Sequence, residues 1–447
     1  MVPHRFRMMP CRVNFWKTSD NPESALDLRI TPLGIALKGN ETMNVNERHA
    51  VSRGSVIELP VHHMRGGTST GLVLWRGALP SDESLLEELL RHLMGVPLSG
   101  DAPGNRQITG LGRGHPTTNK VFLVEYDEAS HRITSTLAQL AAEKCGIDWG
   151  VNCGNMSAAL PLFAYDVGWL SGQAGDAEID IHNTNTNTSM RGRLLLTDGQ
   201  LESSTEIPGV NGRFPGVDLF LHEPTGAKTG KLFPTGAPSD RFGSIDATCL
   251  DVAVPMVIAL AKDFGKTGHE SPEALDADAP FKAALRELWV EAGLRMRLRH
   301  RDGSLMSPTA LAQSETMPKV CIVSPPLGDG HIAVRYFTPQ SAHPSLAVSG
   351  GCCLASACLI EGTVAQRIST LRIRLDEQTT ECRVALENPA GVLEAVIKAS
   401  RVADEPFIAA AAYRRSAQIL LRGTMPLYRA SPSLVEALMT RRQDISR

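Results

Sequence analysis

A single cysteine lies between amide and small side chains in the segment 151–160, which reads VNCGNMSAAL. Asn152, Gly154 and Asn155 are not typical core residues, and the apolar residues that follow predict the start of a helix. A thiol at a helix N-terminus has a lowered pKa, and the unpaired backbone N–H groups there bind anions. The segment therefore predicts a proton-transfer group, Cys153, beside a binding site for an acidic small molecule.

Lys120 is a second candidate for proton transfer. It follows the loop 110–119, which reads GLGRGHPTTN, and precedes the apolar run 121–124. A lysine between a turn and a strand is more often solvated, so its position alone does not decide its role. A partly desolvated lysine near other cations, however, loses its proton near neutral pH and can act as a base.

The segment 64–71, MRGGTSTG, resembles an anion-binding turn. Its glycines let the backbone approach a ligand, while Arg65, Thr68 and Ser69 add donors. It is not a nucleotide-binding P-loop, because the GxxxxGK[ST] spacing is absent. The segment 226–235, GAKTGKLFPT, also resembles a phosphate loop without its first glycine, and could instead cover the site.

The second half of the chain offers weaker candidates. Cys352 and Cys353 open an apolar helical segment and could supply a second acid, although small residues there more often pack a helix against its domain. Arg335, on a predicted strand, either binds a carboxylate or faces solvent. His343 lies just before the helical segment, and the histidines as a set have no metal-binding spacing.

The pattern of apolar residues predicts an α+β protein with an internal repeat. Strand, glycine turn, strands and a helix with cysteine at its start occur in that order twice, which predicts two similar lobes facing one cleft. We expect strands near 56–61, 72–75, 121–124, 247–258, 318–323 and 331–337, β-structure over 179–196, helices over 81–94, 273–297 and 349–360, and a long loop or domain junction over 207–240.

Composition excludes several classes of protein. The 447 residues carry a net charge of −3 and only 5% aromatic residues, which disfavours nucleic-acid binding, and no apolar run is long enough to span a membrane. Nine irregularly spaced cysteines predict reduced thiols and a cytoplasmic location. No CxxC or HExxH motif indicates a metal site.

Taken together, the motifs resemble the PrpF family of allylic isomerases, over about residues 55–430. The family includes 2-methylaconitate isomerase, 4-oxalomesaconate tautomerase and fungal aconitate Δ-isomerase. The segments that carry the resemblance are MRGGTSTG (64–71), GLG with TNK (110–112 and 118–120), NCGN (152–155), PTGAKTGKLFPTG (224–236), TCLD (248–251) with Pro255, and AVSG (347–350). Thr70 stands where the family usually has lysine, and Arg113 and His115 also depart from its pattern.

The resemblance implies a fold of two pseudo-symmetric diaminopimelate epimerase-like lobes around a central cleft. The implied organisation is an N-terminal extension (1–54), a first lobe (55–240), a second lobe (241–430) and a C-terminal tail (431–447). It also implies that Lys120 and Cys153 lie at the reacting carbons. The expected substrate-binding residues are Arg65, Gly67, Thr68, Ser69, Arg113, Asn119, Asn152, Gly154, Asn155, Met156, His343, Ser349 and Gly350.

The expected reaction is a 1,3-proton shift in an unsaturated tricarboxylate, without cofactor or metal. Conversion of cis-aconitate to trans-aconitate is the first candidate, with 4-oxalomesaconate tautomerisation or 2-methylaconitate isomerisation as the alternative. The expected partners are the small acid and, as a possible assembly, a homodimer, with no nucleic acid or membrane. Two other interpretations stay open: racemisation of an amino acid by Cys153 and Cys352, and a non-catalytic protein that binds an organic acid or a partner.

Overall fold

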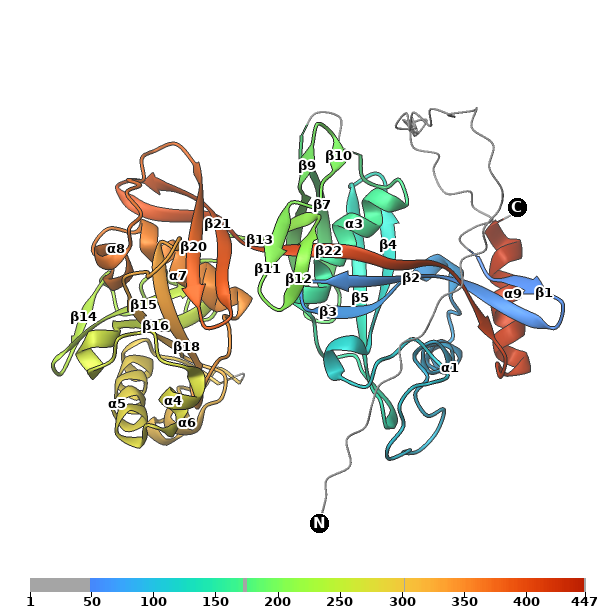
Figure 1. Ribbon diagram of the computed structural model, residues 1–447, viewed down its shortest axis with the longest axis horizontal. Coiled ribbons are helices and arrows are strands. Elements are labelled where there is room, and N and C mark those ends of the chain that lie inside the picture. The colour runs from blue at the N-terminus through green and yellow to red at the C-terminus, as the bar shows by residue number, and fades with distance from the viewer. Residues whose placement is uncertain (1–48, 172–174, 301, 446–447) are drawn as a thin grey trace, which may run out of the picture. The chain divides into compact units, whose positions relative to one another are not determined.

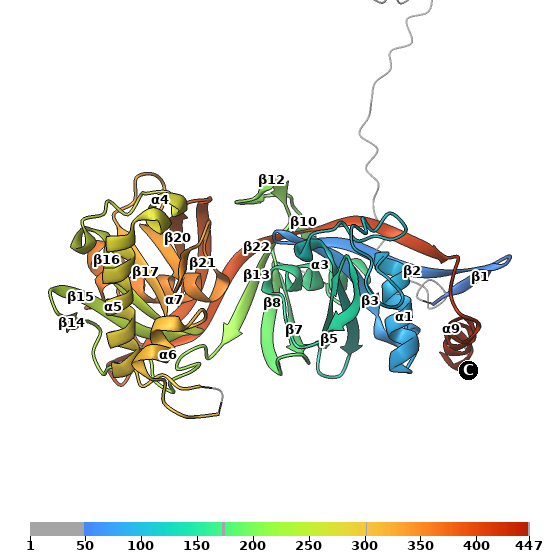
Figure 2. The same ribbon diagram turned by 90° about the horizontal axis from the view of Figure 1, so that it is seen from below.

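The computed structural model describes residues 49–171, 175–300 and 302–445. This part of the chain has a mixed α/β fold that consists mostly of strands (Figures 1 and 2). The predicted N-terminal extension lies outside the described residues up to residue 48. Its last residues form strand β1 (Val51–Arg53), which pairs antiparallel with β2.

Strands of the first half of the described chain form a closed ring together with one strand from residues 405–427. The pairs β2–β3, β4–β5 and β7–β8 are antiparallel, and the pairs β3–β4 and β5–β7 between them are parallel. Strand β13 joins β8 to β22, and β22 pairs with β2, which closes the ring. The strands of the ring are β2 (Val56–Gly66), β3 (Ser69–Trp75), β4 (Lys120–Asp127), β5 (Arg132–Ala141), β7 (Ala177–Asn183), β8 (Thr188–Leu194), β13 (Gly216–His222) and β22 (Glu405–Leu427). Strand β6 (Lys144–Asp148) pairs with β5 and is not part of the ring.

Helix α3 (Ala159–Asp166) lies inside this ring, directly after the one-turn helix α2 (Gly154–Ser157). Its residues 159–164 are all buried, and strand residues such as Phe122, Ile179 and Val217 belong to the same hydrophobic cluster. The sequence ALPLFAYD is apolar on every side, which is typical of a fully enclosed helix. Figure 2 shows α3 among β3, β7, β8 and β22.

Helix α1 (Glu83–Met94) covers the outside of the ring. The Asp82 side chain caps it by accepting the N–H of Leu85, and leucines along one side of α1 pack against the outer face of β3 and β4. The predicted helix over 81–94 is therefore confirmed. Helix α9 (Pro432–Ile445), which follows β22, contributes Leu434 and Leu438 to the same cluster.

The second half repeats the pairing order of the first. The pairs β15–β16, β17–β18 and β20–β21 are antiparallel, and the pairs β16–β17 and β18–β20 between them are parallel. Strand β21 in turn pairs antiparallel with β22. The strands are β14 (Asp240–Phe242), β15 (Ile245–Val252), β16 (Val254–Leu260), β17 (Lys319–Ser324), β18 (Ile332–Thr338), β19 (Ser341–Ala342), β20 (Thr380–Asn388) and β21 (Gly391–Val402). The predicted architectural repeat is thus present in the strand pairings.

Helix α7 (Val348–Leu359) occupies the place in the second half that α2 and α3 occupy in the first. Its residues 350–359 are buried, and its apolar side chains form one hydrophobic cluster with β15, β18, β20 and β21 (Figure 1). The other helices of this half are α4 (Pro272–Ala277), α5 (Ala279–Arg295), α6 (Pro308–Gln313) and α8 (Val364–Ile368). Helix α5 packs on the opposite face of β16 and β17, as α1 does on β3 and β4.

Three expected elements differ from the structure. The interval 207–240 is not only a loop, because it contains β13, and its glycines and prolines obscured that strand. The apolar run 247–258 is a hairpin whose turn is Ala253, with a φ of +62°. The helix over 273–297 is divided into α4 and α5 at Asp278, whose carboxylate accepts the N–H of Phe281 and starts the second helix.

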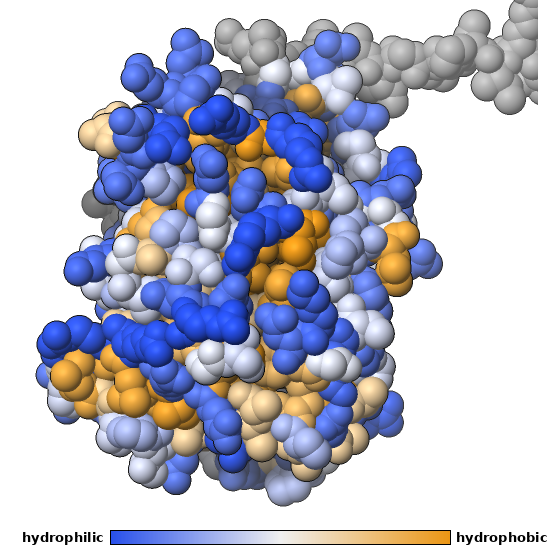
Figure 3. All heavy atoms as spheres, turned by 90° about the vertical axis from the view of Figure 1, so that its left-hand side faces the viewer, coloured by the Kyte–Doolittle hydropathy of each residue, from blue (hydrophilic) through white to orange (hydrophobic). Residues whose placement is uncertain are grey.

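The remaining short elements connect these layers. They are the strand pairs β9 (Leu196–Thr197) with β10 (Gln200–Leu201) and β11 (Thr205–Ile207) with β12 (Val210–Phe214), and the 3₁₀ turns η2 (Arg76–Ala78), η3 (Pro116–Thr118) and η4 (Ala261–Phe264). No described helix is long and apolar enough to cross a membrane. Figure 3 shows hydrophobic patches interspersed with hydrophilic side chains on the face that carries α5 and β14.

Candidate active site

The glycine turn between β2 and β3 contacts the start of α2. A Cβ atom at Gly66 would lie 2.6 Å from the carbonyl oxygen of Asn155, and one at Gly67 would lie 2.4 Å from Asn155 Oδ1. Gly67 also has a φ of +53°, which L-residues with side chains rarely adopt. The two segments that the sequence singled out, MRGGTST and NCGN, therefore touch because glycine leaves room for the approach.

Cys153 is the N-cap residue of α2, as its sequence context predicted. Its Sγ accepts the N–H of Met156 at 3.5 Å and lies 3.7 Å from Ser69 Oγ. The Oδ1 of Asn152 accepts the N–H of Cys153 at 2.7 Å. The thiol is half-buried, so it is fixed in position and still reachable by a small molecule.

Lys120 is the first residue of β4. Because side chains alternate along a strand, Lys120 shares the face of Phe122, which packs towards α3 inside the ring. The lysine is 6% exposed, and its Nζ donates to the carbonyl oxygen of Pro116 at 2.6 Å. Burial lowers the pKa of Lys120, and the neighbouring Cys153 partly opposes this effect. A lysine in this setting can provide a neutral amine at a lower pH than an exposed one.

Two buried arginines, Arg65 on β2 and Arg415 on β22, have no carboxylate partner among the described residues, and Arg415 interacts electrostatically with Cys153. Arg65 donates to the carbonyl oxygens of Gly67 and Ser416 at 2.8 and 3.0 Å, and its Nη2 has no hydrogen-bond partner. Burial lowers the pKa of Arg65 to about 10. Arg415 donates to Asn155 Oδ1 at 2.8 Å, and burial lowers its pKa as well.

Two other buried arginines, Arg193 and Arg414, are paired with carboxylates. Arg414 binds Asp218 with two hydrogen bonds of 2.9 Å, and Arg193 binds Glu381 with two of 2.8 Å. In both cases the carboxylate raises the pKa of the arginine despite burial. Because an unpaired buried cation is costly, Arg65 and Arg415 are candidates for binding an anion.

Arg415 lies where β22 changes partner. Up to Tyr413 the strand pairs with β21, and from Ala417 onward it pairs with β2. The Arg415 guanidinium lies 4.1 Å above the Tyr413 ring and is electrostatically coupled to both Cys153 and Cys352. Sequence reasoning missed this residue, although a charged pair, Arg414–Arg415, within an otherwise apolar strand was a usable signal.

The loop before Lys120 contributes two predicted site residues in different settings. Arg113 is exposed. The pKa of His63 on β2 is lowered to about 4, mainly by burial and in addition by the positive charge of Arg113. Asn119 is fully buried, and neither its Oδ1 nor its Nδ2 has a hydrogen-bond partner. A Cβ atom at Gly112 would lie 2.5 Å from Asn119 Oδ1, so the asparagine packs against its own loop.

The predicted residues of the second half lie around the start of α7. A Cβ at Gly350 would lie 2.3 Å from Cε2 of Tyr336, whose buried hydroxyl has no partner. His343 Nδ1 accepts the N–H of Ser345 at 2.9 Å, and burial lowers the pKa of His343. Ser349 lies in the first turn of the helix. A Cβ at Gly154 would lie 4.0 Å from Val348 Cγ2, so the starts of α2 and α7 approach each other.

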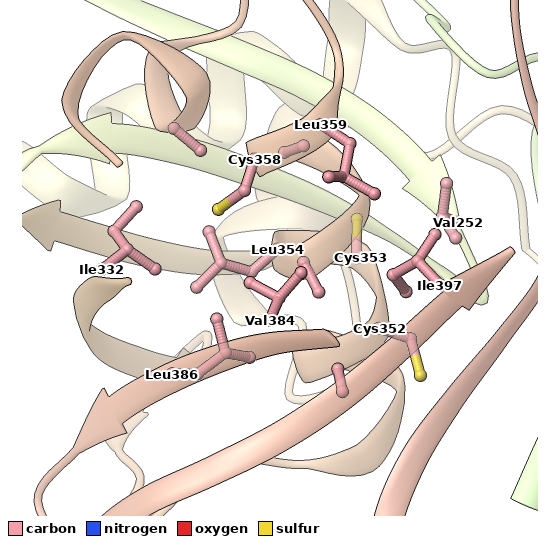
Figure 4. Close-up of a cluster of buried hydrophobic side chains, with 14 of the residues drawn as sticks. Val252, Ile332, Cys352, Cys353, Leu354, Cys358, Leu359, Val384, Leu386 and Ile397 are labelled. Carbon is pink, nitrogen blue, oxygen red and sulfur yellow. The ribbon is translucent and has the colours of Figure 1, made fainter. Parts of the chain in front are cut away.

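Cys352 differs from Cys153 in position and surroundings. The N-cap residue of α7 is Ala347, so Cys352 lies within the helix. It is fully buried among hydrophobic side chains, and burial raises the pKa of Cys352 to about 12 (Figure 4). Cys353 is also fully buried. Two-cysteine racemisation requires the second thiol to reach the substrate, and this position does not meet that requirement.

Two further candidates have internal partners. In the segment 226–235, the N–H groups of Lys228 and Thr229 donate to Asp251 Oδ2 at 2.9 and 2.8 Å. These hydrogen bonds attach the loop to β15, so the two N–H groups are not available to bind a phosphate. Arg335 is buried and donates to the carbonyl oxygens of Glu270 and Val334. Within the ranges that the structure describes, no three His, Cys, Asp or Glu side chains cluster as a metal site would require.

A family model covers most of the chain. The family model described as PrpF protein matches residues 56–428. This chain belongs to the PrpF family. It is an isomerase of that family, as the resemblance in the sequence implied.

Two PrpF relatives and one solved structure illustrate the match. The putative isomerase YbhH of Escherichia coli strain K12 is 34% identical over 75% of this chain and 90% of its own length. The 4-oxalomesaconate tautomerase of Pseudomonas putida is 33% identical over 74% of this chain and 87% of its own. The crystal structure of methylitaconate-delta-isomerase has a TM-score of 0.69 at 25% identity and covers 86% of this chain and 98% of that one.

Proposed function

We propose that this PrpF protein shifts a proton and a C=C bond within an unsaturated di- or tricarboxylate, without a cofactor. The observation that carries the proposal is the electrostatic interaction of Cys153 with both Lys120 and the buried Arg415, which has no carboxylate partner among the described residues. The lysine–thiol pair supplies proton transfer, and Arg65 and Arg415 supply positive charge for substrate carboxylates.

The repeated strand order supports the arrangement that the family resemblance implies. In that arrangement two pseudo-symmetric, diaminopimelate epimerase-like lobes face a central cleft, and the starts of α2 and α7 lie at the substrate. The short approach between Gly154 and Val348 is consistent with it. The lobes would extend over residues 55–240 and 241–430, with one departure in detail: β22, near the end of the second segment, completes the ring of the first.

In the proposed reaction, the neutral amine of Lys120 removes a proton from the CH₂ group next to a carboxylate and allylic to the double bond. The C–H electron pair forms a new C=C bond, and the former double bond shifts its electrons towards the conjugated carboxylate, which gives a dienolate. The arginine cations stabilise this charge. Return of a proton to the far carbon, from the Lys120 ammonium or the Cys153 thiol, completes the shift.

Conversion of cis-aconitate to trans-aconitate is the first candidate substrate reaction. The skeleton of aconitate is symmetric about its central carbon, so the shift regenerates the same connectivity with changed geometry. Tautomerisation of 4-oxalomesaconate is the second candidate, favoured by the similarity to the P. putida tautomerase. Isomerisation of 2-methylaconitate is the remaining alternative.

The test is NMR of the purified protein with each acid separately in ²H₂O. We expect isomerisation of at least one acid, with solvent deuterium appearing at the CH₂ carbon, and full activity after treatment with a chelator. Loss of activity with the chelator would contradict the metal-independent mechanism. If no acid exchanges a proton, the protein is instead a non-catalytic organic-acid-binding or partner-binding member of the family.

A further inference from the structure

The repeat assigns a counterpart to Lys120 in the second half. Lys120 is the first residue of β4 and pairs in parallel with Gly71, the third residue of β3. Lys319 is the first residue of β17 and pairs in parallel with Met256, the third residue of β16. The two lysines therefore hold the same register in equivalent strand pairs.

The two lysines also face equivalent helices. Lys319 shares its strand face with Cys321 and Val323, which belong to the hydrophobic cluster around α7. Lys120 shares its face with Phe122, which belongs to the cluster around α3. Each lysine thus begins a strand on the side where the central helix of its own half lies.

Lys319 has no counter-ion within the described residues. It is half-buried, no hydrogen bond or ion pair of its ammonium occurs there, and no carboxylate offsets the burial that lowers its pKa. The titratable group that its charge affects is His343, whose pKa it lowers. A cation in this position is available for an external anion.

The start of α7 supplies further donors, and His343 and Tyr336 lie between it and Lys319 in the chain of interactions. Its N-cap residue, Ala347, has no side chain that can accept a hydrogen bond, so the first-turn N–H groups are uncapped. Tyr336, 1% exposed, has a hydroxyl without a partner. The hydroxyl-bearing Cζ atom of that ring would lie 2.8 Å from a Cβ at Gly350, and the ring is 5.8 Å from that of His343. The unpaired hydroxyl therefore belongs to the helix start.

We propose that Lys319, the Tyr336 hydroxyl and the first turn of α7 bind one carboxylate of the substrate, so that each half contributes one lysine with a different role. Lys120 transfers the proton, whereas Lys319 stays charged and neutralises the carboxylate on the opposite side. This inference rests on the proposed function for the identity of the anion, and it names the substrate class more closely: an acid with a carboxylate beyond those that Arg65 and Arg415 bind.

The test measures binding of propane-1,2,3-tricarboxylate, which cannot isomerise, and of pentanedioate by titration calorimetry. For Lys319→Gln we expect the Kd of the tricarboxylate to rise by about 10- to 100-fold, the effect of one charge-assisted hydrogen bond, and that of pentanedioate to change less. Lys319→Arg should retain most of the affinity. The control is Lys144→Gln, an exposed lysine that also begins a strand.

A second measurement uses the unmodified protein, so it does not depend on the folding of a variant. Acetic anhydride labelling with peptide mass spectrometry should show that the tricarboxylate protects Lys120 and Lys319 but leaves Lys144 unprotected. Unchanged tricarboxylate affinity in Lys319→Gln, or labelling of Lys319 that the acid does not slow, would overturn the inference. Weakened binding in this variant, with no turnover of any acid by the wild type, would support the carboxylate site and reject the proposed isomerase function.

Discussion

The two central helices occupy equivalent places and begin differently. Helix α2 begins after a half-buried thiol, Cys153, whereas α7 begins after Ala347, and its nearest thiol, Cys352, is enclosed in the core. Both halves nevertheless keep a lysine at the first residue of the equivalent strand, Lys120 and Lys319. The fold therefore repeats although its thiols do not, and in the proposed mechanism proton transfer belongs to the first half.

This asymmetry suits an allylic shift better than racemisation. Racemisation at one carbon needs acid–base groups on two opposite faces, which a thiol in each half would provide. A 1,3-shift can use one group on one face, because the proton leaves one carbon and returns to another nearby. One reactive half and one anion-binding half are enough for that reaction.

Substitution of Lys120 by methionine is expected to have the largest effect on activity. Removal of the base should lower kcat by about 10³- to 10⁴-fold while KM changes little, since the residue acts on the proton rather than on binding. Steady-state kinetics by NMR or ultraviolet absorbance measure this effect, and Lys144→Met serves as the matched control. A variant with near-normal kcat would remove Lys120 from the mechanism.

Substitution of Cys153 by alanine should lower kcat by about 10²-fold, because a proton-transfer partner is lost but the base remains. Iodoacetamide should modify Cys153 in the native protein and leave Cys352 unmodified, as the half-buried and fully buried positions require. Peptide mass spectrometry measures both. Equal labelling of the two thiols would contradict the difference between the helix starts.

Substitution of Arg415 by glutamine should raise KM about 10- to 100-fold, since a charged hydrogen bond to a carboxylate is lost. Arg415→Lys should recover part of the affinity. The informative contrast is Arg414→Gln, which breaks the internal pair with Asp218 and is expected to lower the midpoint of thermal unfolding much more. If Arg415→Gln lowers stability and leaves KM unchanged, its role is structural.

The pH dependence of kcat/KM separates the two lysines. Lys120 must be neutral, so activity should rise about tenfold per pH unit below its pKa, which burial lowers from the usual lysine range. Lys319 must be charged, so activity should fall at higher pH as this lysine, whose pKa is also lowered by burial, loses its proton. In Lys319→Arg the fall at high pH should disappear, and an unchanged profile would contradict the division of roles.

Substitution of Cys352 by alanine should have the smallest effect. The thiol packs in the core, so we expect a loss of about 1 kcal/mol in the free energy of unfolding and kcat within twofold of the wild type. Urea denaturation and the NMR assay measure the two quantities. A large fall in kcat at unchanged stability would restore a catalytic second thiol.

Local patterns in the sequence were sufficient to predict part of the site. The N-cap position of Cys153, the glycine turn after β2, and the helix over 81–94 follow from residue types within a few positions of one another, whereas the contact of that turn with Asn155 does not. The start of α7 was predicted within one residue, because small residues before an apolar run indicate a helix start there as they do at α2.

The parts that the sequence did not predict depend on distant contacts. Arg415 reaches Asn155 from a strand 260 positions away, and nothing near it in the chain indicates that it lacks a carboxylate. Cys153 and Ala347 are equivalent because each is the N-cap residue of its helix, whereas Cys352 lies inside α7. This can be recognised only when the first residue of each helix is known. Strand β13 was hidden by nearby glycines and prolines, because its place between β8 and β22 comes from tertiary pairing.

The course of β22 has a consequence for biosynthesis. The ring around α3 is closed by residues 417–427, which a ribosome adds only after the whole second half. Until then β2 and β13 lack their shared neighbour, and the emerging first half exposes two unpaired strand edges. The half that carries Lys120 and Cys153 therefore completes its fold last, although most of it is synthesised first.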